Sequence, residues 1–358
     1  MSAGSRRRPA VDPPSRGFLY AGPQPHVDRI KLRLAGLEVD FVDRDQAIRW
    51  IERWADRGMA LPHVVYGPEG CGKSAWLRQS AALLRELGFH VIYINPVESS
   101  FAVELGIEDL RSKLMGLIRE AASQTAWGRV VWSVVDIARA AIEAGARKLA
   151  IIVDDVFQVI GLDKAAIYVK GLLGVLEHPP ASYDKIIAIA ATSEGVSLRE
   201  IGRHSWSNTA PMWNMAREGF EQLYERLPGA KPSFEEVWRL TGGNPRMLGR
   251  LYESNWSVDD VVDALIKERG ISRGFVERWR GYLEEAVDDP DSLWYNAPEE
   301  LIDELVERNM IAYFLPERRE SLWVDQPPPE RDLELGVGRR VAWQTPLHRE
   351  AVKKALES

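Results

Sequence analysis

The sequence predicts an α/β fold in which a parallel sheet flanked by helices is followed by a helical region and a C-terminal unit of helices and strands. Apolar segments of strand length alternate with segments of helical periodicity up to about Gly195. Strands that are apolar on both faces and alternate with helices are typical of parallel sheets. Beyond Gly195 the periodicity is mainly helical, which indicates that the sheet ends there.

The predicted sheet begins with a short buried strand over 63–66, which leads into a glycine-rich turn. A helix over 41–54 with Asp43 as its cap precedes it. The remaining strands are expected at 89–95, 149–154 and 185–192. Helices are expected at 74–87, within 108–122, and at 130–144 and 163–177. We therefore expect a core over residues 26–205.

The region 206–270 is expected to form a helical lid, with helices at 218–226, 234–240, 245–254 and 258–269. Ser233 and Glu236 form a capping-box pattern at the start of one of them. Residues 271–358 are expected to form a winged-helix domain, because helices including 298–308 are followed by strand-like segments at 320–325 and 339–343. A last helix is expected from Thr345.

Composition excludes several classes of protein. The chain has 358 residues, 45% of them hydrophobic, and a single cysteine, Cys71, so full-length disorder and a disulfide framework are excluded. No apolar run approaches the roughly 18 residues of a membrane span, and no secretory signal is recognisable, so we expect a cytoplasmic protein without membrane contact. Residues 1–25, with four arginines and five prolines, are expected to be a flexible tail.

The strongest motif is Gly67-Pro-Glu-Gly-Cys-Gly-Lys-Ser74, which fits G-x-x-x-x-G-K-S/T between a strand and a helix. In such a P-loop the backbone N–H groups and the helix N-terminus bind phosphates. Lys73 is expected to reach the β- and γ-phosphates and Ser74 to ligate Mg²⁺. The alternative is a glycine turn with an incidental lysine. The expected nucleotide-binding residues are Gly67, Pro68, Glu69, Gly70, Cys71, Gly72, Lys73, Ser74 and Ala75.

Two carboxylates follow the buried strand 149–154. A carboxylate at the C-terminal end of a strand beside the P-loop strand can hold Mg²⁺, so Asp154 is the expected metal residue. Asp155 then lies where a base or water-orienting group belongs. Because aspartate is one methylene shorter than glutamate, we expect slow hydrolysis. The alternative is that both aspartates only end the strand and begin a turn.

The strand 185–192 ends in hydroxyl groups. If this strand neighbours the P-loop strand, Thr192 or Ser193 can contact the γ-phosphate or the attacking water; the alternative is that they cap the next helix. Arg199 and Arg203 follow, and Arg203 is the expected arginine that stabilises the transferred phosphoryl group, in cis or across a subunit contact. The alternative is a surface ion pair.

Thr241-Gly-Gly-Asn-Pro-Arg246 joins two lid helices. A glycine ends the first helix, Asn244 caps the second and Pro245 occupies its first turn.

Taken together, these motifs resemble the archaeal ATPase family, which belongs to the STAND branch of P-loop NTPases with the NB-ARC proteins and lies close to the AAA+ proteins. The motifs that carry the resemblance are Phe41-Val-Asp-Arg-Asp45, similar to F-x-x-R-E/D before the first helix; the P-loop; Ile151 to Asp155; Gly202-Arg203; Gly242-Gly-Asn-Pro245, similar to G-G-x-P; and Thr345-Pro-Leu-His-Arg349, similar to D-P-x-x-R of a winged helix.

The resemblance implies an ATP-dependent switch in which nucleotide lies between the sheet and the lid, beside Pro245, and the winged helix moves as ADP and ATP exchange. The chain departs from the family in having Asp155 where glutamate is common and Thr345 where aspartate is usual. His348 lies near the place of the NB-ARC histidine over the ADP phosphate, but we expect it on the surface of a helix.

Two other functions stay open beside the switch: an ATP-controlled DNA-binding protein related to replication-initiator ATPases, and a protein that holds nucleotide without turnover. Residues 296–358 contain nine basic and thirteen acidic residues, a net charge of −4, which disfavours DNA binding by the winged helix. The macromolecular partner and the oligomeric state are left open by the sequence.

Overall fold

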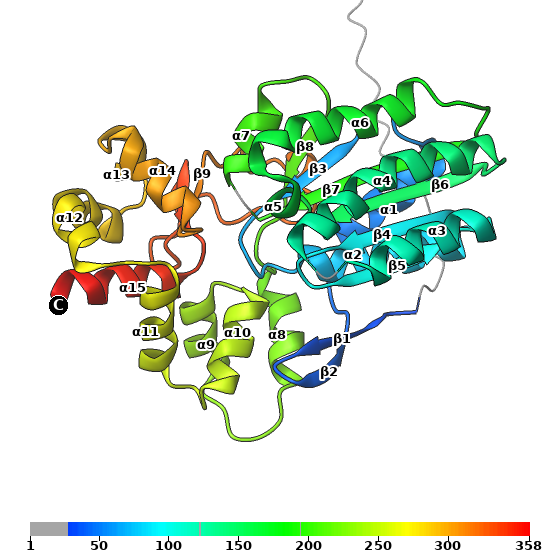
Figure 1. Ribbon diagram of the computed structural model, residues 1–358. Coiled ribbons are helices and arrows are strands. Elements are labelled where there is room, and N and C mark those ends of the chain that lie inside the picture. Colours follow the sequence, from blue (N-terminus) through cyan, green and yellow to red (C-terminus); the bar gives the residue numbers. More distant parts are fainter. Residues whose placement is uncertain (1–27, 122, 194) are drawn as a thin grey trace, which may run out of the picture.

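The computed structural model describes residues 28–121, 123–193 and 195–358; the expected tail over 1–25 lies outside these ranges. Three parts are visible in Figure 1: a core built on a six-stranded sheet, a group of lid helices below it, and a C-terminal unit beside both. Among the described residues, none of the helices has the length and apolarity that a membrane span requires.

The central sheet has the strand order β5-β4-β6-β7-β3-β8, and all neighbours are parallel except the β5-β4 pair. The strands are β3 (His63–Tyr66), β4 (His90–Asn95), β5 (Ser100–Glu104), β6 (Lys148–Asp154), β7 (Lys185–Thr192) and β8 (Asn208–Pro211). The four predicted strands are confirmed, whereas the two edge strands β5 and β8 were not predicted. The predicted adjacency of β6 and the P-loop strand β3 is wrong, because β7 lies between them.

Helices cover both faces of the sheet. The helices α1 (Asp45–Arg57) and α2 (Lys73–Glu86) pack with one face of the strands in one hydrophobic cluster. The helices α3 (Glu108–Arg119), α4 (Gln124–Glu143) and α6 (Ala165–Glu177) cover the other face. The predicted cap of α1 is wrong: Arg44 occupies the N-cap position with a left-handed backbone, and no side chain caps this helix.

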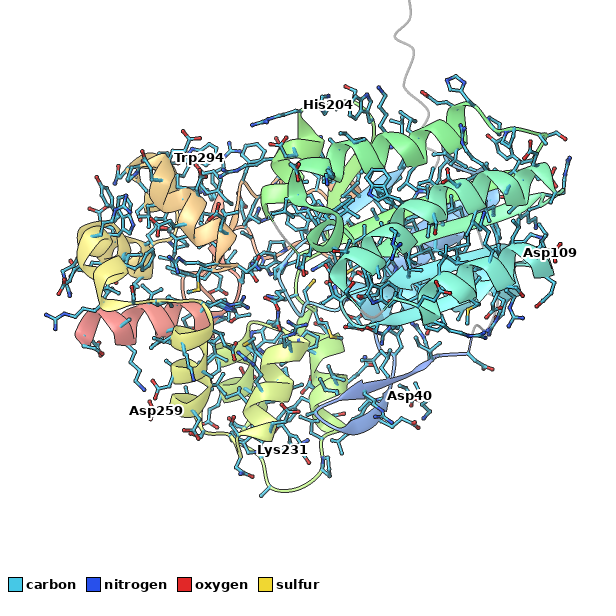
Figure 2. All side chains as sticks on the ribbon, in the orientation of Figure 1. Asp40, Asp109, His204, Lys231, Asp259 and Trp294 are labelled. Atoms are coloured by element: carbon cyan, nitrogen blue, oxygen red, sulfur yellow. The ribbon has the colours of Figure 1, made fainter. Side chains whose placement is uncertain are left out.

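The lid consists of α8 (Arg217–Glu225), α9 (Phe234–Thr241), α10 (Pro245–Glu253) and α11 (Val258–Glu268). The capping box of Ser233 and Glu236 at α9 is present, and the Asn244 side chain accepts a hydrogen bond from the Met247 N–H at the start of α10. An unpredicted hairpin of β1 (Lys31–Leu34) and β2 (Leu37–Asp40) packs against the lid. Asp40, at the end of the hairpin (Figure 2), forms an ion pair of 2.9 Å with Arg226.

The C-terminal unit (residues 271–358) contains α12 (Arg273–Asp288), α13 (Ser292–Tyr295), α14 (Glu299–Glu307) and α15 (Pro346–Glu357), with a ribbon of β9 (Ile311–Tyr313) and β10 (Val341–Trp343). The prediction of a strand at 320–325 is wrong. This segment forms a short 3-10 turn over 320–322 and then docks on the core, where the Val324 N–H donates to the Pro211 carbonyl over 2.9 Å. Val324 packs in the core cluster, whereas Trp323 packs mainly among residues of the C-terminal unit, so the segment does not form the ribbon.

A buried ion pair fixes this docked segment. The Arg44 guanidinium, at the start of α1, lies 2.6 Å from the Asp325 carboxylate, and both side chains are almost fully buried. Arg44 also donates to the Cys71 carbonyl at 2.5 Å and to the Trp213 carbonyl at 2.9 Å. The arginine of the F-x-x-R-E/D motif thus joins the P-loop to the C-terminal unit.

Removing one partner of this pair leaves a buried charge without compensation. We expect Asp325→Ala to lower the free energy of unfolding by about 3 kcal/mol, measured by urea denaturation. Arg44→Met with Asp325→Leu should restore part of the loss, because the Cys71 and Trp213 carbonyls still lack their donor. Asp40→Ala, which removes exposed ion pairs, serves as the matched control and is expected to have a much smaller effect. Equal losses in the two single variants would contradict this assignment.

Candidate nucleotide-binding site

A cavity of about 690 Å³ lies above the P-loop, between the core and the lid, and we call it the P-loop cavity. Glu69, Gly70, Cys71, Gly72, Lys73, Ser74, Ala75, Asp155 and Pro245 line it, whereas Gly67 and Pro68 line a different cavity of about 400 Å³ on the other side of the loop. One end of the P-loop cavity is apolar. It is formed by residues of the unpredicted hairpin and of the lid region: Leu32, Leu34, Val39, Met215 and Leu223. The cavity thus has an apolar end and a phosphate-binding end.

The P-loop glycines are required by close backbone approaches. A Cβ atom on Gly67 would lie 1.9 Å from the Met212 carbonyl oxygen, and one on Gly70 would lie 2.3 Å from the Cβ of Arg246. Gly72, with φ of 105°, occupies the N-cap position of α2. Only glycine accommodates both the contacts and the left-handed backbone.

Lys73 is folded back onto its own loop. Its ammonium group donates to the carbonyls of Gly67 and Pro68, both at 2.9 Å. The side chain is buried, so it has exchanged water for these two acceptors. To reach the phosphates of a nucleotide, Lys73 has to leave this position.

Asp154 fits the role of a magnesium residue. Its side chain is fully buried, and one carboxylate oxygen accepts from the Asn95 amide at 2.9 Å and the Tyr93 hydroxyl at 3.3 Å, while Oδ1 has no hydrogen-bond partner. Burial raises the pKa of Asp154 to about 7, the charge of Asp155 adds to this, and the Ser74 hydroxyl opposes it. A buried carboxylate oxygen without a partner beside a hydroxyl is a donor set that Mg²⁺ accepts.

Asp155 lies directly after β6 with a left-handed backbone, φ of 49°, and its N–H donates to the Ala191 carbonyl at 3.0 Å. Its Oδ1 is buried without a hydrogen-bond partner. Burial raises the pKa of this carboxyl, although Lys73 opposes the shift. Asp155 therefore lines the P-loop cavity, and its backbone is held in place by the hydrogen bond to β7.

The other two predicted catalytic residues differ in their placement. Thr192 is buried at the end of β7, opposite Tyr66 of β3, so the expected contact between these strands exists. Arg203 follows α7 (Gly195–Gly202), is 68% exposed and pairs with Glu200 at 2.8 Å. Arg203 does not line the P-loop cavity, so the structure does not bring it to the site within one chain.

Glu69, in the P-loop, is the point where all three parts of the molecule meet. Its carboxylate is bound by Arg269 at 2.5 Å and by Arg246, both from the lid. Its carbonyl accepts from the Asn244 amide at 2.9 Å, and its N–H donates to the Gln344 side chain of the C-terminal unit at 2.9 Å. Burial opposes ionisation, but the two arginines outweigh it and lower the pKa of Glu69.

Sequence reasoning missed most of these contacts. It found Asn244 only as a helix cap, although the same side chain binds the P-loop and also Asn214 at 2.8 Å. Arg269 and Gln344 carry no local pattern, because the P-loop is 200 and 275 residues away from them. The one local signal for these contacts was Glu69 itself, a charged residue in the variable part of the P-loop motif.

His348 is buried, so the prediction that it lies on a helix surface is wrong. Its Nδ1 is 2.8 Å from the Thr345 hydroxyl, and its Nε2 has no hydrogen-bond partner. Burial lowers the pKa of His348 to about 3, and the charge of Arg269 contributes. The imidazole is therefore neutral at pH 7, beside the lid arginine that binds Glu69.

The buried imidazole predicts a pH dependence of stability. Between pH 6.5 and about 3 the unfolded chain protonates His348 and the folded chain does not, so stability falls as the pH falls through this window. One such proton contributes up to about 1.4 kcal/mol per pH unit. We expect His348→Gln to reduce this slope in urea denaturation between pH 7 and 4.5, with the remainder due to groups such as His63, whose pKa burial lowers to about 4. Parallel pH profiles would contradict the burial of a neutral His348.

The chain is similar to solved structures and to one protein-family model. RuvB from Thermotoga maritima is 13% identical, with 76% of this chain and 90% of that chain aligned at a TM-score of 0.41. AMPPCP-bound DnaA from Aquifex aeolicus is 14% identical, with 71% and 77% aligned at a TM-score of 0.37. No curated protein sequence matches the chain.

A family model of an ATPase domain found predominantly in Archaea matches residues 41–251, more than half of the chain. The matched region includes the P-loop, Asp154, Asp155 and the lid motif. The chain therefore belongs to this family of archaeal-type P-loop ATPase domains.

Proposed function

We propose that the protein is a Mg-ATP-dependent molecular switch of the STAND type with slow ATP hydrolysis. The observation that carries the proposal is the set of bonds on Glu69, which join the phosphate-binding loop to the lid and to the C-terminal unit. Any change in the charge or shape of the loop acts on these bonds first. Nucleotide binding and the arrangement of the three parts are thereby coupled.

The coupling follows from electrostatics. The phosphates of ATP bind next to the Glu69 carboxylate and repel it, and they compete with it for Arg246 and Arg269, which line the same cavity. Lys73 leaves the loop carbonyls to bind them. The lid arginines then bind phosphate instead of Glu69. Once Glu69 is released from the lid, its hydrogen bond to Gln344 of the C-terminal unit is weakened. The nucleotide-bound form thus has a different preferred position of the C-terminal unit.

The chemical step is assigned to residues at the end of β6. Ser74 and Asp154 would hold Mg²⁺, which neutralises phosphate charge when it is bound. Asp155 orients or deprotonates the attacking water, and its short side chain makes this step slow. Thr192 contributes from the neighbouring strand end. Because Arg203 is exposed and does not line the P-loop cavity, its proposed contact with the phosphoryl group is made across a subunit interface in an oligomer.

Hydrolysis distinguishes the catalytic residues from the binding residues. In multiple-turnover ATPase assays with Mg²⁺ after removal of co-purified nucleotide, we expect Asp155→Asn to lower kcat roughly 100-fold while the Kd for ATP stays within about threefold. Lys73→Ala removes the phosphate-binding ammonium, so it is expected to lower both ATP affinity and turnover.

Glu143→Gln, an exposed carboxylate at the end of α4 outside the cavity, serves as the control and is expected to behave like the wild type. Tight ATP binding without turnover in the wild-type protein would show a nucleotide-loaded protein that does not hydrolyse, and the assignment of Asp155 would then be wrong.

The Glu69 carboxylate is expected to oppose ATP binding. Glu69→Gln keeps the shape of the side chain but removes the charge that binds Arg246 and Arg269, so ATP affinity in isothermal titration calorimetry should rise roughly tenfold. Glu253→Gln removes a carboxylate that lines the same cavity without an ion pair in the described structure, and it should have little effect. Equal gains in the two variants would indicate a general charge effect and contradict the specific role of Glu69.

A further inference from the structure

A separate groove of about 640 Å³ lies between α1 and the 3-10 turn of the C-terminal unit. Arg49, Arg53 and Arg57 line it from α1, and Glu320 lines it from the turn. The three arginines are four residues apart, so they follow one side of the helix with about 6 Å between successive positions. Neither of the acidic residues Glu52 and Asp56 of the same helix lines the groove.

These arginines differ from most others in the described part of the chain, which have a carboxylate within ion-pair distance. In the ranges that the structure describes, none of the three has such a partner. Burial lowers the pKa of Arg53, and the charges of Arg49 and Arg57 lower it further, which shows that the three repel one another. The groove therefore carries concentrated positive charge in a protein of net charge −7.

The aromatic residues of the groove are engaged with other side chains of the protein. The Arg53 guanidinium lies 5.2 Å from the centre of the Trp50 ring. Trp50 also contacts Trp54 edge-on at 5.4 Å, and Trp54 is buried. No large apolar side chain of α1 is exposed. The cation at Arg53 is thus oriented before a ligand binds.

We propose that this groove binds the phosphate backbone of duplex DNA. A regular row of arginines without carboxylate partners fits a regular row of phosphates. A protein partner is disfavoured because interfaces are usually anchored by buried apolar side chains, which this helix does not expose. Single-stranded nucleic acid is disfavoured because its binding depends on aromatic rings that stack with bases. Trp54 is buried, and the Trp50 ring already carries the Arg53 guanidinium.

The position of the groove links it to the proposed switch, on which this part of the inference rests. Its second wall, Glu320, belongs to the C-terminal unit, and Asp325, five residues later, is bound to Arg44 at the start of α1. In the closed arrangement a carboxylate therefore faces the arginines. Movement of the C-terminal unit away from α1 removes this carboxylate and opens the groove to DNA.

The test is fluorescence anisotropy of the full-length protein with a labelled 24-base-pair duplex over a range of salt concentrations. Replacing Arg49, Arg53 and Arg57 together by Gln is expected to weaken binding roughly 100-fold at 0.1 M salt and to reduce the slope of log K against log salt by about 2.7, since each phosphate contact contributes about 0.9. Glu320→Gln is expected to tighten binding several-fold. Unchanged melting temperature and ATP affinity confirm that the triple variant is folded.

Two matched triple variants carry the same change in charge: Arg273, Arg278 and Arg280 of α12, and Arg6, Arg7 and Arg8 near the N-terminus, each replaced by Gln. Both should keep most of the wild-type slope. A loss in either control as large as in the α1 variant, or absence of duplex binding by the wild type, would overturn the proposal. So would equally tight binding of a single-stranded 24-mer. If DNA affinity depends on the α1 arginines but not on ATP, the groove binds DNA as proposed, and the proposed coupling of DNA binding to the switch is wrong.

Discussion

The carboxylate of Glu69 is a negative charge placed inside a loop whose purpose is to bind negative charge. Two lid arginines compensate it, an asparagine of the lid and a glutamine of the C-terminal unit bind the adjacent backbone, and Lys73 is folded onto the same loop. Glu69 is thus the residue at which core, lid and C-terminal unit are all joined. Phosphate and Glu69 are therefore alternative partners of the same arginines, which is the physical basis of the proposed switch.

The strand order places the chemical groups around this loop. Because β7 lies between β3 and β6, Thr192 is next to the P-loop strand and Asp154 is one strand further away. Asp154 reaches the site because its carboxylate is aimed into the buried space next to Ser74, with Asn95 of β4 holding one oxygen. Asp155 is positioned by the backbone bond to Ala191. The sheet thus fixes the metal and water-orienting groups, while the lid and the C-terminal unit supply the movable contacts.

The sequence predicted the features that have local patterns. The buried strands, the P-loop, the α9 capping box and the two carboxylates after β6 were all found, because each depends on residues close together in the chain. The short strands β1, β2, β5 and β8 were missed because four or five residues carry too little periodicity by themselves, whereas the equally short β3 was found because it leads into the P-loop. The strand expected at 320–325 was wrong because this segment docks on the core through Val324. The contacts of Arg269 and Gln344 with Glu69 depend on folding over long separations in the chain. The burial of His348 was not recognised for the same reason.

The central claim is that ATP changes the position of the C-terminal unit relative to the core. Pulsed electron paramagnetic resonance between spin labels at Asp109→Cys on α3, an exposed position at the far end of the core (Figure 2), and Glu284→Cys on α12 measures this directly. The native Cys71 is fully buried, which protects it from labelling. We predict one distance distribution without nucleotide and a shifted distribution with Mg-ATP, and the shifted distribution should appear without nucleotide when Glu69 is replaced by Gln. Identical distributions in all three samples would contradict the switch.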